Sequence, residues 1–455
     1  MNFNKVNNIT GWIVCIIACA VYILTAEAGG SLWDCGEFVS SCFKLQVPHP
    51  PGAPLFVVIG RIFIVLFGDN PLTAAKAVNI MSALASGFTI LFLFWTITHF
   101  TRKIYQKAHA ALSAEKVFTI MAAGVVGALA FTFSDSMWYS AVEGEVYAFS
   151  SFLTALVFWM MLKWEHNADE PGADRWIVLL FFVIGLSIGI HLLNLLTIPA
   201  IVMIYYFRRY KTTPWGIFWA FIVGCIITGF VQKFVIQYTI TGSGIFDRWF
   251  VNGLGLPFFS GFTAYFVLLG IVILIGIRKA DKLINNFTGF AVWLSVFIFL
   301  FSFPYITSFL SFLLFVAGTA IIVYAAYHSR LKILNFLKLG LWCFAFILIG
   351  YSTYLTTMIR SAANPSVDMY NVDNPMSLVG YVGREQYGDF PLIYGQTFAA
   401  DVKRNADGTP MVKEKGYRWQ KGDNKYINIG KNFEYEYEDE DMMFLPRIWD
   451  ASNDQ

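Results

Sequence analysis

The sequence is short of charge. Aspartate, glutamate, lysine and arginine together make up 14% of the chain, roughly half of their usual share in a soluble domain. A soluble helical protein of this composition would expose too much apolar surface. Several uncharged runs reach the roughly 20 residues that cross a bilayer core, and 57% of the chain is hydrophobic. These features predict an all-α polytopic membrane protein.

Cysteine and net charge are also low. The formal net charge is +2, which does not indicate a nucleic-acid partner. Four of the six cysteines fall in apolar runs, where a thiol behaves as a small hydrophobe. If Cys35 and Cys42 lie on one helix, about 10 Å separates them, which is too far for a disulfide. No cysteine or histidine spacing indicates a metal site.

The apolar runs predict about eleven transmembrane helices. The run at 51–68 is short and interrupted by Arg61, so we expect an interfacial or re-entrant helix there. The run from Trp176 to Phe207 is too long for one helix, and we expect two short helices that meet near His191. The predicted spans are 11–28, 73–99, 117–134, 147–164, 176–190, 192–207, 214–239, 259–277, 287–303, 305–326 and 335–356.

The short loops between these runs predict the orientation. One alternate set of loops carries most of the lysine and arginine residues, among them Arg102, Lys116, Arg208, Arg209 and Lys279. Cytoplasmic loops carry such an excess, so this set is assigned to the inside. The N-terminus is then inside, and the C-terminus is outside.

The chain becomes polar after the last apolar run. We therefore expect a transmembrane domain over 1–358, whose first outer loop (29–72) contains interfacial helices, and an extracytoplasmic region of β type over 359–455. Turn signals such as Asp407-Gly408 support this division. The sequence stops at Gln455 without an obvious closing element, which favours a fragment of a longer protein.

Acidic residues near a membrane are costly unless they are paired or used. The segment GGSLWDCGEF follows the first predicted span and contains Asp34 and Glu37, which share one face if the segment is helical. Two neighbouring carboxylates can divide the roles of base and of acid or ligand. A capping box, with Ser31 as N-cap and Asp34 three residues later, is the alternative, and the two interpretations are compatible.

Two further outer segments carry candidate binding residues. In His49-Pro50-Pro51-Gly52, the proline forces His49 toward an extended conformation. A loop with an incidental histidine is the alternative. Glu143 and Glu145 precede a predicted span, where the helix dipole favours acids. They are compatible with a divalent cation, although spacing completes no ligand set.

A fourth group consists of His191 and Asn194 within GLSIGIHLLNLL, together with Arg248 and Arg360. The histidine and asparagine indicate a cavity lining or, alternatively, a hydrogen bond between helices. Arg360 follows the last span and is suited to a lipid phosphate, because arginine binds phosphate oxygens bidentately. An interfacial anchor is the competing interpretation.

Together these motifs resemble a known family. The order of an outer-loop acid, His-Pro-Pro and an alanine-rich span is similar to the GT-C superfamily of membrane glycosyltransferases. GGSLWDCGEF, VPHPPGAPLF, FSDSMWYSAVEGEVYAFSS and GLSIGIHLLNLLTIPA, joined later by IRSAANP and REQYG, resemble one family more narrowly. That family was long labelled a domain of unknown function in bacteria, and it includes a eukaryotic transmembrane protein O-mannosyltransferase.

The resemblance implies a GT-C-like fold in a bacterial inner membrane and an active site on the outer face. It implies a sugar donor carried on a polyprenyl phosphate, an acceptor hydroxyl on a polypeptide or glycan, and contact with membrane lipid. The catalytic base of the family maps to Asp34, with Glu37 beside it. His49, Glu143, Glu145, His191, Asn194 and Arg360 are then the expected substrate-binding residues, with no metal ligand assigned.

Two rival functions stay open. A transporter or flippase of lipid-linked sugars would show internal repeats and polar groups at the membrane midplane. The sequence shows no repeat, and its polar groups collect at one face. A GT-C enzyme that modifies lipid or cell-envelope glycan would use the same residues on another acceptor.

Overall fold

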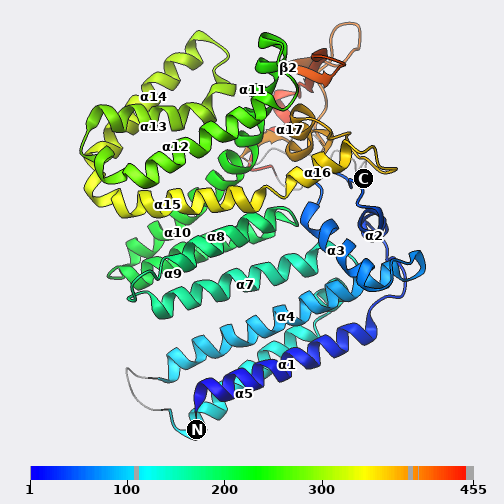
Figure 1. The fold of residues 1–455 in the computed structure, drawn as a ribbon, viewed down its shortest axis with the longest axis vertical. Coiled ribbons are helices and arrows are strands. Elements are labelled where there is room, and N and C mark those ends of the chain that lie inside the picture. The colour runs from blue at the N-terminus through cyan, green and yellow to red at the C-terminus, as the bar shows by residue number, and fades with distance from the viewer. Residues whose placement is uncertain (1, 107–111, 388–392, 398, 447–455) are drawn as a thin grey trace.

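The computed structural model describes residues 2–106, 112–387, 393–397 and 399–446. Long helices run side by side in one bundle (Figure 1), and ten described segments are long and apolar enough to cross a membrane. They contain α1 (Phe3–Thr25), α4 (Pro71–Tyr105), α5 (Ala114–Thr132), α7 (Val146–Asn167), η1 (Leu192–Thr197) with α9 (Ile198–Arg209), α10 (Pro214–Phe230) with η2 (Val231–Tyr238) and α11 (Thr239–Leu254), α12 (Ser260–Ile284), α13 (Phe287–Ser302), α14 (Phe309–His328), and α15 (Arg330–Tyr351) with α16 (Tyr354–Ser361). The predicted all-α membrane fold is confirmed.

The one predicted span that is not among these ten segments, 176–190, corresponds to α8 (Arg175–Ile188). Its 14 residues give about 21 Å of helix, which is less than a bilayer core of about 30 Å. The helix ends three residues before His191, whose extended backbone (φ −161°) starts η1. The predicted break near His191 is therefore confirmed.

Two short helices lie at the bundle end that the charge pattern assigns to the outside (Figure 1): α2 (Cys35–Lys44) and α3 (Pro54–Leu66). The 13 residues of α3 cover about 20 Å and are too few to cross a membrane. Arg61 on this helix pairs with Asp69 (2.6 Å) and donates to the carbonyl of Phe43 (2.7 Å). The run at 51–68 therefore forms a short helix, as predicted.

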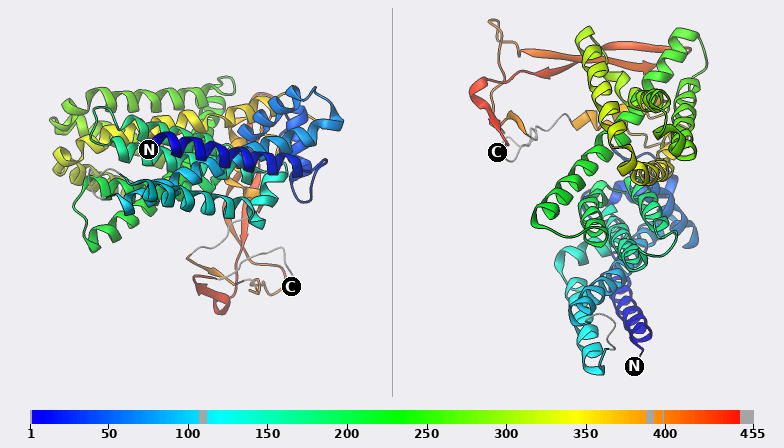
Figure 2. Two further views of the ribbon diagram at one scale, coloured as in Figure 1. Left: turned by 90° about the horizontal axis from the view of Figure 1, so that it is seen from below. Right: turned by 90° about the vertical axis from the view of Figure 1, so that its left-hand side faces the viewer.

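The C-terminal part contains the strands that the sequence predicts, together with short helices that it did not predict. It contains α17 (Pro375–Gly383), an antiparallel pair of β2 (Val412–Lys421) and β3 (Tyr426–Tyr435), and a small pair of β1 (Tyr394–Gln396) and β4 (Met442–Phe444). The strands project away from the helices (Figure 2). Buried Tyr426 fastens them to α11, because its hydroxyl donates to Asp247 (2.7 Å).

Helices α8 and α15 approach each other closely at two glycines. A Cβ atom at Gly185 would lie 2.4 Å from the carbonyl oxygen of Ile347, and one at Gly350 would lie 2.5 Å from that of Phe182. Small residues permit such contacts between membrane helices, where packing replaces the hydrophobic effect. These glycines set the distance between the two helices.

Valine at Gly185 should therefore destabilise the protein by about 1–3 kcal/mol, because overpacking forces the helices apart. The matched control is Gly318→Val on α14, where a Cβ atom meets nothing within 4 Å. Thermal unfolding of the detergent-solubilised variants measures the effect. Equal midpoints for the two variants would contradict this account of the α8–α15 contact.

Candidate functional site

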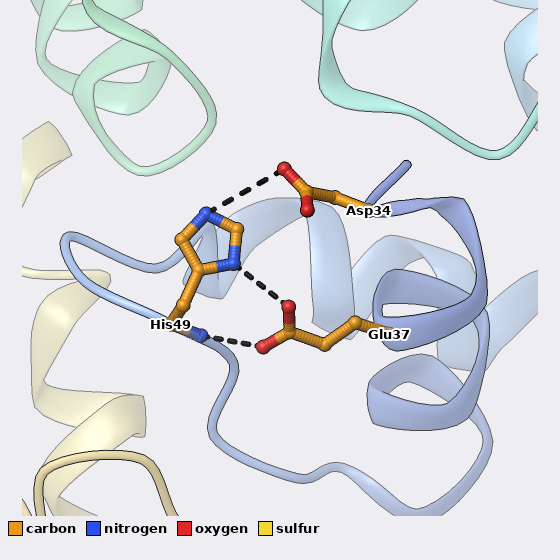
Figure 3. A group of neighbouring side chains, drawn as sticks. All are labelled: Asp34, Glu37 and His49. Atoms are coloured by element: carbon orange, nitrogen blue, oxygen red, sulfur yellow. Dashed lines mark hydrogen bonds and ion pairs between the residues drawn. The ribbon is translucent and has the colours of Figure 1, made fainter. Parts of the chain in front are cut away.

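The structure brings Asp34, Glu37 and His49 together at the predicted outer end (Figure 3). Glu37 lies in the first turn of α2, and Asp34 is its N-cap residue. Trp33, with a positive φ of 59°, turns the chain into this helix. The Asp34 side chain makes no capping hydrogen bond and is 56% exposed. The capping box is therefore wrong, and the Asp34 carboxylate is left accessible.

Glu37 holds His49 through two hydrogen bonds. One carboxylate oxygen accepts the backbone N–H of His49 (2.7 Å), and the other bonds to Nδ1 of its ring (2.8 Å). The bond to His49 lowers the pKa of Glu37, and the same carboxylate raises the pKa of His49. An ionised Glu37 therefore stabilises a charged His49. The other ring nitrogen, Nε2, faces Asp34 Oδ2 at 3.9 Å (Figure 3).

The loop around His49 is supported by the C-terminal part of the chain. Tyr381 on α17 is buried and donates its hydroxyl to the carbonyl of Pro48 (2.6 Å). Gly52 has a φ of +68°, and a Cβ atom there would lie 2.1 Å from the same hydroxyl. Val47 also pairs with Asp368 in an isolated parallel bridge. Tyr381 could not be predicted from the sequence, because its partner lies 333 residues away.

The two acids of the Glu143–Glu145 segment belong to different helices. Glu143 ends α6 (Asp135–Val142), and Glu145 is the N-cap of α7, with extended backbone at both residues. Glu145 is 7% exposed and accepts the N–H of Val146 (3.0 Å). Burial raises its pKa to about 7, and the charges of Asp34 and Glu143 act in the same direction. The bend therefore brings both acids toward Asp34.

Helix α4 supports the approach to Asp34. The side-chain amide of Asn79 donates to the carbonyls of Glu27 (2.9 Å) and Gly29 (3.0 Å), and Lys76 donates to that of Ala26 (2.6 Å). Asn79 is buried, and it would lie 3.0 Å from a Cβ atom at Gly144. It therefore separates the two acidic loops. Asn79 was not predicted as a site residue, although a lone asparagine in an alanine-rich span is a usable signal.

Helix α7 connects His191 to the acidic loops. The ring of His191 packs edge-on against Tyr147 of this helix, with 5.3 Å between the ring centroids. The Nδ1 atom of His191 accepts the N–H of Leu193 (3.2 Å). Asn194 is fully buried, and its Oδ1 lies 3.3 Å from Thr197 Oγ1. Within the described residues its Nδ2 has no partner. His191 is thus near the site, whereas Asn194 lies beneath the surface.

Arg360 binds the C-terminal end of α2. Its Nε donates to the carbonyl of Leu45 (2.7 Å), and an Nη donates to that of Lys44 (3.3 Å). A cation suits this position, because helix C-termini carry unsatisfied carbonyls. Arg360 also borders a hollow of about 200 Å³ that apolar residues such as Val57 line. Its assignment to a donor phosphate stays a prediction.

Arg384 is a cation that was not predicted as a site residue. It ends α17 in the left-handed conformation (φ 57°) and is exposed. Burial lowers the pKa of His191, and the charge of Arg384 lowers it further. The two side chains therefore lie near each other. Arg248, by contrast, lies 4.3 Å over the ring of Trp419 in β2.

Asp34, Glu37 and His49 also offer ligand atoms that lie within 4.8 Å of one another. Carboxylate oxygen and imidazole nitrogen bind divalent cations. Because Glu37 occupies Nδ1, it would orient the ring, and Nε2 and Asp34 would face the ion, as in carboxylate–histidine–metal arrangements. Spacing did not indicate this set, since 12 residues separate Glu37 from His49.

Comparison with known proteins bears on the part of the chain that holds most of these residues. Residues 34–214 match the family described as the protein O-mannosyl-transferase TMEM260 N-terminal domain. The predicted family resemblance is confirmed. The match begins at Asp34 and ends after the segment of His191 and Asn194. Residues 388–455 match a family of unknown function, DUF8416. No solved structure matches the chain.

Two curated relatives carry the same transferase name. Protein O-mannosyl-transferase tmem260 of Dictyostelium discoideum is 26% identical over 157 residues, which are 34% of this chain and 17% of that protein. Protein O-mannosyl-transferase TMEM260 of Mus musculus is 27% identical over 169 residues, or 37% of this chain and 21% of that protein. The chain thus spans about a fifth of the length of these relatives.

Removing the charge of Glu37 should change the titration of His49. In Glu37→Gln the pKa of His49 should fall toward its ordinary value, so more of the ring is neutral near pH 7. Diethyl pyrocarbonate acylates the neutral imidazole, and mass spectrometry of the His49 peptide measures the reaction. We expect severalfold faster modification than in the unsubstituted protein. Asp135→Asn is the control, and the same rate in Glu37→Gln and its parent would refute the pairing.

Burial of Glu145 predicts a pH-dependent stability change. Its pKa is raised from 4.5 to about 7, so ionisation of the folded protein costs stability as the pH rises between these values. Glu145→Gln lacks this cost, and its thermal midpoint relative to the parent should improve from pH 5 to pH 8. The gain is at most about 3 kcal/mol. Glu115→Gln, at an exposed acid, should show no such trend; a flat difference for Glu145→Gln would contradict the shift.

Proposed function

We propose that the protein is a glycosyltransferase that moves a sugar from a polyprenyl phosphate to an acceptor hydroxyl, with a serine or threonine of a polypeptide as the preferred acceptor. The observation that carries the proposal is the accessible Asp34 carboxylate beside the Glu37–His49 pair, at the start of the matched O-mannosyl-transferase domain. The names of the two relatives support a protein acceptor and mannose as the sugar.

Asp34 is the proposed base. A hydroxyl is a weak nucleophile until a positioned group accepts its proton. In the proposed step the acceptor O–H transfers its proton to Asp34 while the oxygen bonds to the anomeric carbon. The bond from that carbon to the phosphate oxygen breaks, and the polyprenyl phosphate leaves with the bonding electrons. This single displacement inverts the anomeric centre.

The Glu37–His49 pair positions the base. Because Glu37 stabilises the charged ring, His49 presents positive charge to Asp34 from 3.9 Å. This attraction orients the carboxylate in a part of the site that stays open to an acceptor. Fixed orientation of a catalytic group contributes to rate because less motion is lost during the reaction.

Neighbouring groups are suited to the donor. Because the pKa of Glu145 is about 7, its carboxyl group is protonated in a large fraction of the molecules at neutral pH. In that form it can donate a hydrogen bond to a phosphate oxygen. Arg360 borders the apolar hollow under the His49 loop, so its guanidinium and that hollow suit a phosphate and the first isoprene units. His191 packs against Tyr147 of α7, and the charge of Arg384 acts on it. Cations stabilise the negative charge of a leaving phosphate.

We propose an outer-face site in a bacterial inner membrane, with the N-terminus in the cytoplasm. The proposal rests on the excess of lysine and arginine in the loops at the opposite end of the bundle. The site would then face the compartment where secreted polypeptides present their hydroxyl groups.

Asp34→Asn should lower sugar transfer by about 10²–10⁴-fold, because the amide cannot accept the proton. Purified protein, mannosyl polyprenyl phosphate and serine- or threonine-containing peptides are incubated, and mass spectrometry measures glycopeptide and released lipid phosphate. Donor binding should persist. Asp135→Asn, which changes an acid on another loop, is the control for charge.

Undiminished transfer by Asp34→Asn would exclude this residue as the base. Movement of intact donor across a membrane without release of lipid phosphate would identify a transporter instead. Transfer to a glycan but not to peptide would assign the other acceptor class. A parallel reaction with a chelator tests the cation: loss of activity that Mg²⁺ or Mn²⁺ restores would show that transfer requires a divalent cation.

A further inference from the structure

The N-terminus lies at the bundle end opposite α2 (Figure 1). A second hollow is lined there by residues of α1, α4 and α7, among them Phe3 and Asn4. It has a volume of about 440 Å³. Helix α4 forms its floor, and α1 and α7, which both pack on α4, form its walls. The hollow therefore belongs to the leaflet that the charge pattern assigns to the cytoplasm, and it takes no part in the proposed transfer.

The floor of this hollow is aromatic. Trp95 on α4 stacks on Trp159 of α7 (5.8 Å between centroids), and Trp12 of α1 meets Trp95 edge-on (6.3 Å). Toward the membrane interior, Phe92 continues the row 5.1 Å from Trp159, and Phe88 lies 6.2 Å from Trp12. This row offers an apolar track that leads from the hollow along α4 into the bilayer.

The aqueous end of the hollow is positively charged. Lys163 lies 5.0 Å over the ring of Trp159, and Arg102 lies 4.5 Å over that of Phe3. Among the described residues neither cation is paired with a carboxylate. The nearby Glu165 is engaged by His99 (3.1 Å) and Lys103. The charge of the two lining cations is therefore available to an anion.

Two buried polar atoms lie behind the lining of the hollow, and exposed amides lie at its rim. The indole N–H of Trp95 and the side-chain oxygen of Asn7 are buried, and within the described part of the chain they have no hydrogen-bond partner. Asn4 and Asn8 add exposed amides at the rim. The rim amides can donate hydrogen bonds to the oxygens of a phosphate group, whereas the two buried atoms face the helix packing.

We propose that this hollow binds a membrane lipid with an anionic phosphate head, whose hydrocarbon chain follows the aromatic row along α4. The head would lie between Arg102 and Lys163, and the exposed amides of Asn4 and Asn8 would donate to its oxygens. The site is separate from the candidate transfer site, which lies at the other end of the bundle. A glycerophospholipid and a polyprenyl phosphate share this chemistry.

The test is native mass spectrometry of the full chain with added lipids. Phosphatidylglycerol and polyprenyl phosphate are compared with phosphatidylcholine and with inorganic phosphate. The double variant Arg102→Gln/Lys163→Gln should retain at least fivefold less of whichever anionic lipid binds. Lys279→Gln, which changes an exposed lysine outside the hollow, is the matched control and should retain the lipid. The lipid with the greater charge-dependent retention identifies the source.

A second variant separates binding from folding. Asn8→Asp adds a negative charge to the exposed rim and removes no buried contact, so it should weaken anionic-lipid retention with an unchanged thermal midpoint. Equal retention by the double variant and its parent would overturn the proposal. The same loss in Lys279→Gln, or binding of inorganic phosphate without preference for lipid, would also overturn it. Sugar transfer tests the other site independently.

Discussion

The pairing of Glu37 with His49 fixes the geometry on which the candidate site depends. One carboxylate binds both the backbone and the ring of the histidine, so it sets the position of the loop and the orientation of the imidazole together. The accessible carboxylate of Asp34 then faces a ring nitrogen whose direction is already determined. Without that pair, Asp34 would be one more exposed acid at the end of a helix.

Burial divides the acids of this region into different chemical states. Asp34 is largely exposed, Glu37 is held by a histidine, and Glu145 is almost fully buried. The same side-chain chemistry therefore yields an accessible carboxylate, a fixed ion-pair partner and a group that keeps a proton near neutral pH. Environments that separate the pKa values of neighbouring carboxyl groups are a common way to assign acid and base roles.

The membrane helices could be predicted from sequence because each depends on its own composition and length. The helical spacing of Asp34 and Glu37 was readable for the same reason. Three other features could not be predicted from sequence, because each depends on contacts between distant segments. They are the hydrogen bonds between Glu37 and His49, the burial of Glu145, and the contact of Tyr381 with the His49 loop. Hydropathy predicts which segments enter the bilayer, but it does not predict how their ends meet.

The contact between Tyr381 and Pro48 has a consequence for biosynthesis. The His49 loop emerges from the ribosome long before its support, since 333 residues separate the two partners. Arg360, which binds the carbonyls at the end of α2, is also made late. A nascent chain that already contains the matched segment 34–214 therefore still lacks the contacts that shape its loop. The transfer site would mature only after the later helices have entered the membrane.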